Sequence, residues 1–290
     1  MLIKDSHRPI VVAHRGASAV APENTRSSFL KAIEFNADYF ELDCRLTRDG
    51  KLVVIHDPDV SRVSARNTPI VEMHMRDLRL VDVGSWFAPE FSGERLITLE
   101  EAFELAASRI GVYVEIKSTT DETPLIPNML EVVEHTERLT DSDWRMLMEA
   151  AYRLSADSVV TARVVINAIR EYSNRCHIVA QAFSPIIATV FRWEAPDLRF
   201  EFLGMDLPEP PNIWRHYIEY GRRIGVAGFN INKESMTPER VAAFHGMGTT
   251  CAVWVADEPK DIEACVRCGA DAIITNKPDR CIEVLEQMQH

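Results

Sequence analysis

Acidic side chains recur at a spacing of two in one short apolar stretch of the sequence. Glu41 and Asp43 stand in the run YFELDCRL. In a β-strand they would point to the same side, about 7 Å apart along the backbone. Glu115 and Lys117 repeat the spacing in YVEIKS. If the two runs form neighbouring strands, three carboxylates and one ammonium group share a face.

Three carboxylates that converge need positive charge among them. Each pair would repel by roughly 4 kcal/mol at 4 Å and an effective dielectric constant of 20. Lys117 offsets one charge, and a divalent cation with oxygen ligands would offset the rest. Carboxylates without cysteine or clustered imidazole favour Mg²⁺, Ca²⁺ or Mn²⁺ over Zn²⁺. We therefore predict one divalent metal ion held by Glu41, Asp43 and Glu115, in preference to solvated strand-end charges and a rim ion pair.

Two histidines end strand-like runs nearby in the sequence. His14 ends PIVVAH, and His56 ends KLVVIH, which follows the hairpin signal TRDGK. Imidazole, with an ordinary pKa of about 6.5, is a natural acid or base near neutral pH. Arg15 adds a forked cation suited to a phosphate or carboxylate, and Gly16 permits a sharp turn. The sequence predicts two proton carriers and an anion clamp at a metal-centred site, without deciding which histidine is the acid.

These side chains need a scaffold that gathers strand ends at one place. Short runs rich in Val and Ile alternate with longer stretches of helical period, which is typical of βα units around a parallel sheet. We expect strands at residues 9–14, 38–46, 111–117, 177–183, 198–203, 226–231, 249–256 and 271–276. We expect helices at residues 22–35, 98–108, 184–195, 212–224, 237–247, 259–268 and 278–288, the first with Pro22 near its first turn.

Eight such strands predict an α/β fold, a (β/α)₈ barrel that forms a single domain over residues 1–290. The outer face of the barrel lies under helices and must be apolar, so the charged set must point into its mouth. Two segments exceed a minimal barrel: an insertion at 57–97 and a helical extension at 118–176 with about three helical stretches. Both leave the carboxyl ends of strands and are expected to crowd the mouth.

The overall charge restricts the partners. A formal net charge of -12 argues against nucleic acid or an anionic membrane surface as the main partner. The first ten residues lack the apolar stretch of a secretory signal, and no run is long enough to span a membrane. We expect a cytoplasmic protein without stable membrane insertion. The sequence leaves its oligomeric state open, a homo-oligomer included.

Several motifs resemble one known family. They are HRG at 14–16, PENT at 22–25, ELD at 41–43, TRDGKLVVIHD at 47–57, LITLEEAF at 96–103 and VEIK at 114–117. The sequence resembles the glycerophosphodiester phosphodiesterases, more faintly through QAF at 181–183, VWVAD at 253–257 and DAIITNKPD at 271–279. The resemblance departs at Ala182, where relatives often have Ser, and at Asn276, where Asp is usual.

The resemblance implies a (β/α)₈ barrel that hydrolyses glycerophosphodiesters to sn-glycerol 3-phosphate and an alcohol. It implies a divalent metal on Glu41, Asp43 and Glu115, acid–base catalysis by His14 and His56, a phosphate grip by Arg15 and Lys117, and an apolar wall of Phe183 and Trp254 beside the glycerol. Two alternatives stay open: phospholipase D-type action on lysophospholipids or sphingolipids, and a barrel that binds a phosphorylated ligand without catalysis. Head-group preference and the choice between water and a substrate hydroxyl as nucleophile also stay open.

Overall fold

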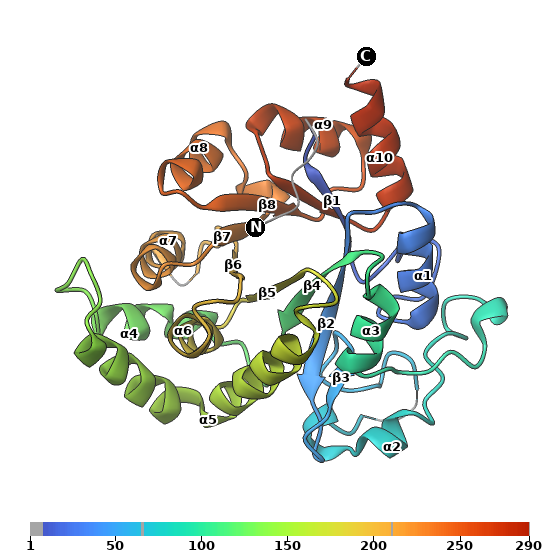
Figure 1. Ribbon diagram of the computed structural model, residues 1–290, viewed down its shortest axis with the longest axis horizontal. Helices are drawn as coiled ribbons and strands as arrows, with labels where there is room; N and C mark the ends of the chain where they lie inside the picture. The colour runs from blue at the N-terminus through green and yellow to red at the C-terminus, as the bar shows by residue number, and fades with distance from the viewer. Residues whose placement is uncertain (1–7, 65–66, 210, 290) are drawn as a thin grey trace.

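Eight parallel strands close into a barrel in the computed structural model, which describes residues 8–64, 67–209 and 211–289 (Figure 1). The ring closes because β1 pairs with both β2 and β9. Its strands are β1 (Ile10–Ala13), β2 (Tyr39–Leu46), β4 (Gly111–Ile116), β5 (Ile178–Ala182), β6 (Phe200–Gly204), β7 (Gly228–Asn232), β8 (Thr250–Trp254) and β9 (Ala272–Thr275). The predicted barrel is confirmed, and KLVVIH forms β3 (Leu52–Val54), antiparallel to β2 outside the ring.

Helices surround the ring and cover its outer face (Figure 1). They are α1 (Arg26–Glu34), α3 (Leu99–Ala106), α5 (Asp141–Tyr172), α6 (Pro185–Glu194), α7 (Ile213–Ile224), α8 (Pro238–Gly246), α9 (Pro259–Cys268) and α10 (Pro278–Gln287), with the short α2 (Met75–Leu78) and α4 (Ile126–Glu131). Phe40, Leu42 and Cys44 of β2 pack in the core under these helices, so the alternate residues of β2 face inward. No helix of the described ranges is long and apolar enough to cross a membrane.

The first helix begins later than predicted. Thr25 is its N-cap and accepts a hydrogen bond from the Ser28 backbone, so α1 starts at Arg26. Asn24 has a left-handed backbone with φ 57°, which ends any helical path from Pro22. Residues 22–24 therefore form a loop, and this loop turns the Asn24 side chain toward β2.

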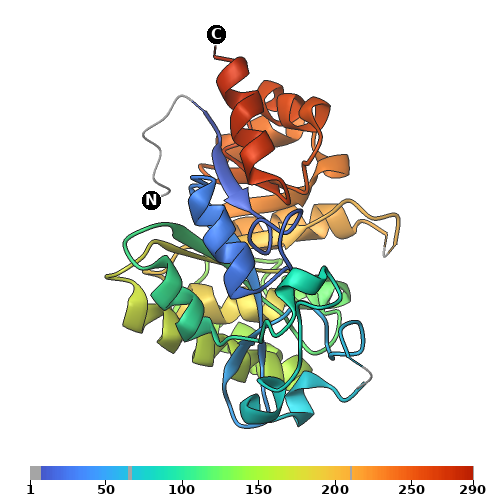
Figure 2. The ribbon, with the colours of Figure 1, turned by 90° about the vertical axis from the view of Figure 1, so that its right-hand side faces the viewer.

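The two segments that exceed a minimal barrel, residues 57–97 and 118–176, pack against different parts of the molecule (Figure 2). Residues 57–97, cyan to teal, contribute most of a small hydrophobic cluster of their own, which includes Val60, Ile70 and Leu78. In the 118–176 extension, α5 is interrupted at Ser155, which is not helical, and packs along α6 outside the ring. The expectation that the whole extension crowds the mouth is therefore wrong, because the apolar face of α5 is buried against α6 and only the first part of the extension reaches the mouth. That 1–290 forms a single domain stays a prediction, and residues 1–7, where we expected no secretory signal, lie outside the described ranges.

Candidate active site

A cavity of about 330 Å³ opens at the carboxyl ends of the strands, as expected for a barrel of this class. The structure brings all of the residues predicted for the site to this end of the barrel. His14, Arg15, Glu41, His56, Glu115, Lys117, Phe183 and Trp254 line the cavity, and Asp43 is fully buried beside Glu115 on the neighbouring strand.

The three carboxylates converge. One oxygen from each of Glu41, Asp43 and Glu115 lies within 4.8 Å of the others, and all three side chains are buried. Oδ2 of Asp43 accepts a hydrogen bond from Nδ2 of Asn24 at 2.8 Å, and Oε2 of Glu41 accepts one from the backbone N–H of Arg15 at 2.9 Å. Within the described residues, Oε1 of Glu41 has no hydrogen-bond partner. An unpaired buried carboxylate oxygen in an all-oxygen cluster fits a hard divalent cation.

The electrostatics of the cluster are uneven. Burial raises the pKa of Glu41 well above its usual range, and repulsion from Asp43 and Glu115 raises it further. Burial would also raise the pKa of Asp43, but Lys117 and Arg15 more than offset it and hold that pKa below its ordinary value. Lys117 lies 2.9 Å from Oδ1 of Asp43 and also contacts Glu115. The cations thus neutralise Asp43 and leave Glu41 short of positive charge.

The loop after β1 needs unusual backbone conformations to place Arg15. Arg15 itself has φ 55° and Gly16 has φ 80°, both left-handed. A Cβ at Gly16 would lie 2.4 Å from Oγ of Ser28, so only glycine fits where the loop passes α1. The guanidinium of Arg15 then lies 3.2 Å from Oδ2 of Asp43 and 2.9 Å from Oε1 of Glu23.

His14 is oriented by an amide. Its Nδ1 lies 2.8 Å from Oδ1 of Asn276, while Nδ2 and the backbone N–H of Asn276 donate to Asp257, each at 2.7 Å. Because the Asp257 carboxylate can only accept, Asn276 must point its oxygen at His14, and Nδ1 of His14 carries the proton. The Nε2 of His14 is left as a proton acceptor. Burial lowers the pKa of His14 to about 4, and Arg15 contributes in the same direction.

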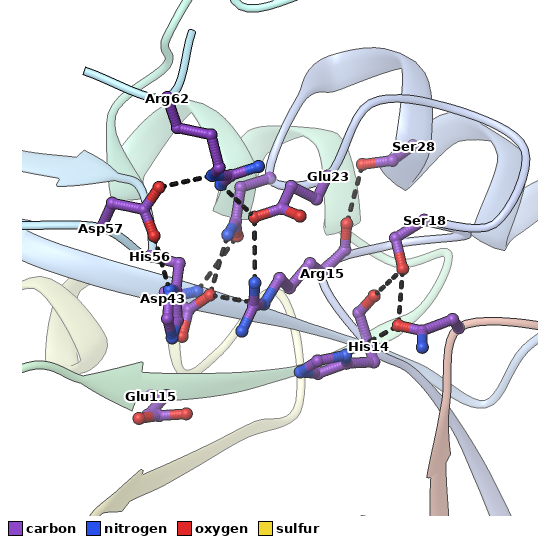
Figure 3. A network of polar contacts seen from close by, with 12 residues as sticks. His14, Arg15, Ser18, Glu23, Ser28, Asp43, His56, Asp57, Arg62 and Glu115 are labelled. Carbon is purple, nitrogen blue, oxygen red and sulfur yellow. Dashed lines mark hydrogen bonds and ion pairs between the residues drawn. The ribbon is translucent and has the colours of Figure 1, made fainter. Parts of the chain in front are cut away.

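His56 is oriented by a carboxylate instead (Figure 3). Its Nδ1 lies 2.9 Å from Oδ1 of Asp57, and Oδ2 of Asp57 accepts from Nε of Arg62 at 2.6 Å. Arg62 also donates to Oε1 of Glu23 at 2.7 Å, and Glu23 binds Arg15. A chain of polar contacts therefore leads from His56 through Asp57 and Arg62 of the inserted segment to Glu23 and Arg15.

Sequence reasoning missed these supporting residues. Asn24 stands inside PENT, and Asp57 ends TRDGKLVVIHD, so both stood in motifs without a role being assigned. Asn276 follows β9 as His14 follows β1, and the pairing of Ala13 with Thr275 sets the two side by side. Arg62 lies in the irregular insertion, where no periodic pattern pointed to it.

An apolar wall closes one side of the cavity. The rings of Phe183 and Trp254 meet edge to face with centroids 5.7 Å apart. Leu203, Met205 and Ile274 line the same cavity. The mouth thus presents charged groups on one side and aromatic carbon on the other.

Comparison with known proteins identifies the relationship. The profile of the Glycerophosphoryl diester phosphodiesterase family matches residues 14–280. The chain belongs to this family. Among its relatives, a Glycerophosphodiester phosphodiesterase of Caldanaerobacter subterraneus subsp. tengcongensis is 29% identical over 282 residues, which cover 97% of this chain and 99% of that protein.

Solved structures of the family share the barrel. A phosphodiesterase of Oleispira antarctica in complex with the product sn-glycerol-3-phosphate superposes with a TM-score of 0.75 at 20% identity, over 96% of this chain and 97% of that one. A putative glycerophosphoryl diester phosphodiesterase of Silicibacter pomeroyi gives 0.76 at 23% identity, over 97% and 94%. At these identities the likeness establishes the fold, while the family profile establishes membership of a family of phosphodiesterases.

Proposed function

We propose that the protein is a metal-dependent phosphodiesterase that hydrolyses glycerophosphodiesters to sn-glycerol 3-phosphate and an alcohol. One observation carries the proposal: a buried triad of carboxylates lies at a single cavity, which two of its members and two histidines line. The names of its relatives support the substrate class, and the bound product in the Oleispira antarctica enzyme supports the glycerol 3-phosphate half. These relatives favour neither phospholipase D-type action nor binding without catalysis.

Glu41, Asp43 and Glu115 would hold the metal, Mg²⁺ or Ca²⁺ by the chemistry of the ligands. When bound, such an ion supplies positive charge that polarises a phosphoryl oxygen. Arg15 and Lys117 would add two fixed positive charges beside the phosphate, so the anion becomes open to attack. Their own carboxylate partners hold both cations in place before substrate arrives.

His14 and His56 would act as the proton carriers. Each has its Nδ1 fixed by a neighbouring side chain, so Nε2 is the nitrogen that can exchange a proton with the substrate. One imidazole accepts the proton of the nucleophile, and the other donates a proton to the leaving alkoxide. General acid–base catalysis of this kind contributes about 10²- to 10⁴-fold per group. Phe183 and Trp254 would form the apolar wall beside the carbon skeleton of the glycerol.

The test is release of sn-glycerol 3-phosphate from glycerophosphocholine. We expect a chelator to abolish the activity and added Mg²⁺ or Ca²⁺ to restore it. His14→Ala and His56→Ala should each lose at least about 100-fold in kcat. His245→Ala is the matched control, because His245 is an exposed histidine on α8 bonded to Asp271. Full activity in His14→Ala, or insensitivity to the chelator, would contradict the proposal.

A further inference from the structure

We propose that a second cavity, adjoining the catalytic one, is the subsite for the leaving alcohol and selects alcohols with an apolar chain. This inference rests on the proposed function and specifies its substrate. The second cavity has a volume of about 390 Å³, at the lower end for small-molecule sites. Five residues line both cavities: Glu115, Lys117, Phe183, Leu203 and Met205. A phosphate beside Lys117 would therefore have one substituent in each chamber.

The loop after β6 forms one wall. Met205 and Leu207 line the second cavity, and Asp206 between them contacts Arg240 at 2.5 Å. The backbone N–H of Asp206 also donates to Oγ of Ser235 at 2.7 Å. Because Asp206 is tied to this outer contact, its two apolar neighbours are held toward the cavity.

An aromatic ring forms the floor. The Tyr217 hydroxyl donates to the Phe202 carbonyl at 2.7 Å, so its polar atom is satisfied away from the cavity. A Cβ on Gly204 would lie 2.5 Å from the Tyr217 ring, so this glycine allows the ring to lie flat against β6. The buried Ile213 of α7 lines the cavity beside Tyr217.

The opposite wall is the start of the 118–176 extension. Glu122 is buried and accepts hydrogen bonds from Oγ of Ser158 at 2.7 Å and from Oγ of Ser184. Arg45 donates to the carbonyl of Ser118 at 3.0 Å and to that of His56 at 2.9 Å. These contacts fix the loop onto α5, α6 and the loop after β3, so the protein's own hydrogen bonds hold this wall in place.

Both chambers combine apolar walls with polar groups, and the polar groups differ. The catalytic chamber adds the polar groups of His14 and Gln181, which suit the hydroxyls of glycerol. The second chamber is also lined chiefly by carbon, together with polar side chains that include Ser118, Thr119, Thr120, Asp121 and Thr123, and the two cations that line it are engaged by carboxylates or carbonyls. Its apolar side chains include Ile116, Ile126, Phe183, Met205, Leu207 and Ile213. An alkyl chain leaving water gains about 4-fold in affinity for each methylene that the walls cover.

A homologous series of diesters tests the subsite. Glycerophosphoethanol, glycerophosphobutanol and glycerophosphohexanol differ only in the chain, and kcat/KM is measured from released sn-glycerol 3-phosphate. We expect kcat/KM to rise at least about 10-fold from ethyl to hexyl, chiefly through KM, because the chain binds equally in ground and transition states. Leu207→Asn should flatten the series, whereas Leu80→Asn, at another exposed leucine outside either cavity, should leave it steep. An unchanged series in Leu207→Asn, or a flat one in the wild type, overturns the subsite.

Binding without turnover separates this inference from the proposed function. Hexyl phosphate should bind at least about 10-fold more tightly than ethyl phosphate in calorimetry of the metal-loaded protein, and Leu207→Asn should remove the difference. Hydrolysis of all diesters at equal rates, with equal binding of the two monoesters, would refute the subsite alone. Absence of hydrolysis, with tighter binding of hexyl phosphate, would refute the proposed function and leave the subsite supported.

Discussion

Two clusters of buried charge lie inside the same barrel, one at its mouth and one near its base. At the base, Glu201 is fully buried and paired with Arg199, whose Nη2 lies 2.7 Å from Oε1 of Glu201 and donates to Oγ1 of Thr250 at 2.6 Å. At the mouth, Lys117 and Arg15 form ion pairs with Asp43 and Glu115, and the third carboxylate, Glu41, has no ion pair with either cation.

The difference between the clusters is charge balance rather than burial. The base has one anion and one cation and gains a structural ion pair. The mouth has an excess of anions, and Arg15 is shared further with Glu23. An excess of buried negative charge is unfavourable unless a bound cation or ligand balances it. The excess at the mouth therefore indicates a binding site, whereas the balanced pair at the base is structural.

Glu41→Gln should have the largest effect and should act oppositely on activity and stability. Loss of one metal ligand should lower kcat/KM at least about 1000-fold, equivalent to about 4 kcal/mol of lost transition-state stabilisation. The metal-free protein should become more stable by about 1 kcal/mol, because Gln removes repulsion with Asp43 and Glu115 and keeps the shape. Kinetics with saturating metal and urea unfolding in chelator measure the two effects. If metal-free Glu41→Gln were less stable than the metal-free wild type, the carboxylates at the mouth would not carry an excess of negative charge.

Glu201→Gln should behave in the reverse way. It leaves the guanidinium of Arg199 without its anion, which should lower the free energy of unfolding by about 3 kcal/mol. The rise in Tm produced by metal should persist, and kcat should stay within about twofold of wild type. Thermal unfolding with and without metal checks both statements. Loss of the metal response in this variant would show that the two clusters are not independent.

The pattern of each cluster was readable from the sequence to a different degree. Alternation along a strand is local, so the inward-facing Glu41, Asp43 and Glu115 followed from a spacing of two once the strands were assigned. Arg199 and Glu201 have the same spacing of two in LRFEFL, so their ion pair could also be read from local alternation, although the sequence analysis assigned neither residue a role. At the mouth, charge balance also depends on side chains from several loops, which local periodicity does not place.

Loop geometry accounts for what could not be predicted. The late start of α1 depends on the left-handed Asn24, and the contact of Arg62 with Asp57 depends on how an irregular insertion folds back. The position of α5 was also hidden, since an apolar helical face predicts burial but not which neighbour covers it. The closeness of His14 and Asn276 followed from barrel closure and was available in principle.

Lowering the pH should destabilise the protein through His14 at the mouth and should have no such effect through the pair at the base. Burial and Arg15 lower the pKa of His14 to about 4, whereas an unfolded chain has about 6.5. Between these values the unfolded state binds a proton that the folded state does not, so stability is complete above pH 6.5 and falls as the pH drops toward 4. We expect a loss of about 2 kcal/mol, less than full burial would give, because His14 is half-buried at the cavity.

The comparison with a variant isolates that contribution. His14→Gln should lose less stability than wild type between pH 7.5 and pH 4.5 in chelator, while Glu201→Gln should lose as much as wild type. Urea unfolding at a series of pH values gives both slopes. Equal slopes for wild type and His14→Gln would show that His14 is not held neutral by the fold.

Arg62→Met should have the smallest effect, and it tests how far the mouth cluster extends. Arg62 bridges Asp57 and Glu23, so its loss frees the carboxylate that orients His56 and adds to the surplus of negative charge. We expect kcat to fall about 5-fold, or about 1 kcal/mol, with KM nearly unchanged, because the imidazole is less well oriented while the phosphate grip remains. Arg62→Lys should recover part of the loss.

Arg79→Met is the matched control for Arg62→Met. Arg79 lies in the same insertion, and its guanidinium lies 2.9 Å from the carboxylate of Glu101. Neither Arg79 nor Glu101 lines either cavity. Its loss should leave kcat, KM and the pH profile of kcat unchanged. If both variants lose kcat equally, the insertion acts on the mouth only by holding its shape. If Arg62→Met alone loses kcat and also shifts the pH profile of kcat, the positive charge of Arg62 helps to balance the carboxylates at the mouth. The base, in contrast, is balanced by the single pair of Arg199 and Glu201.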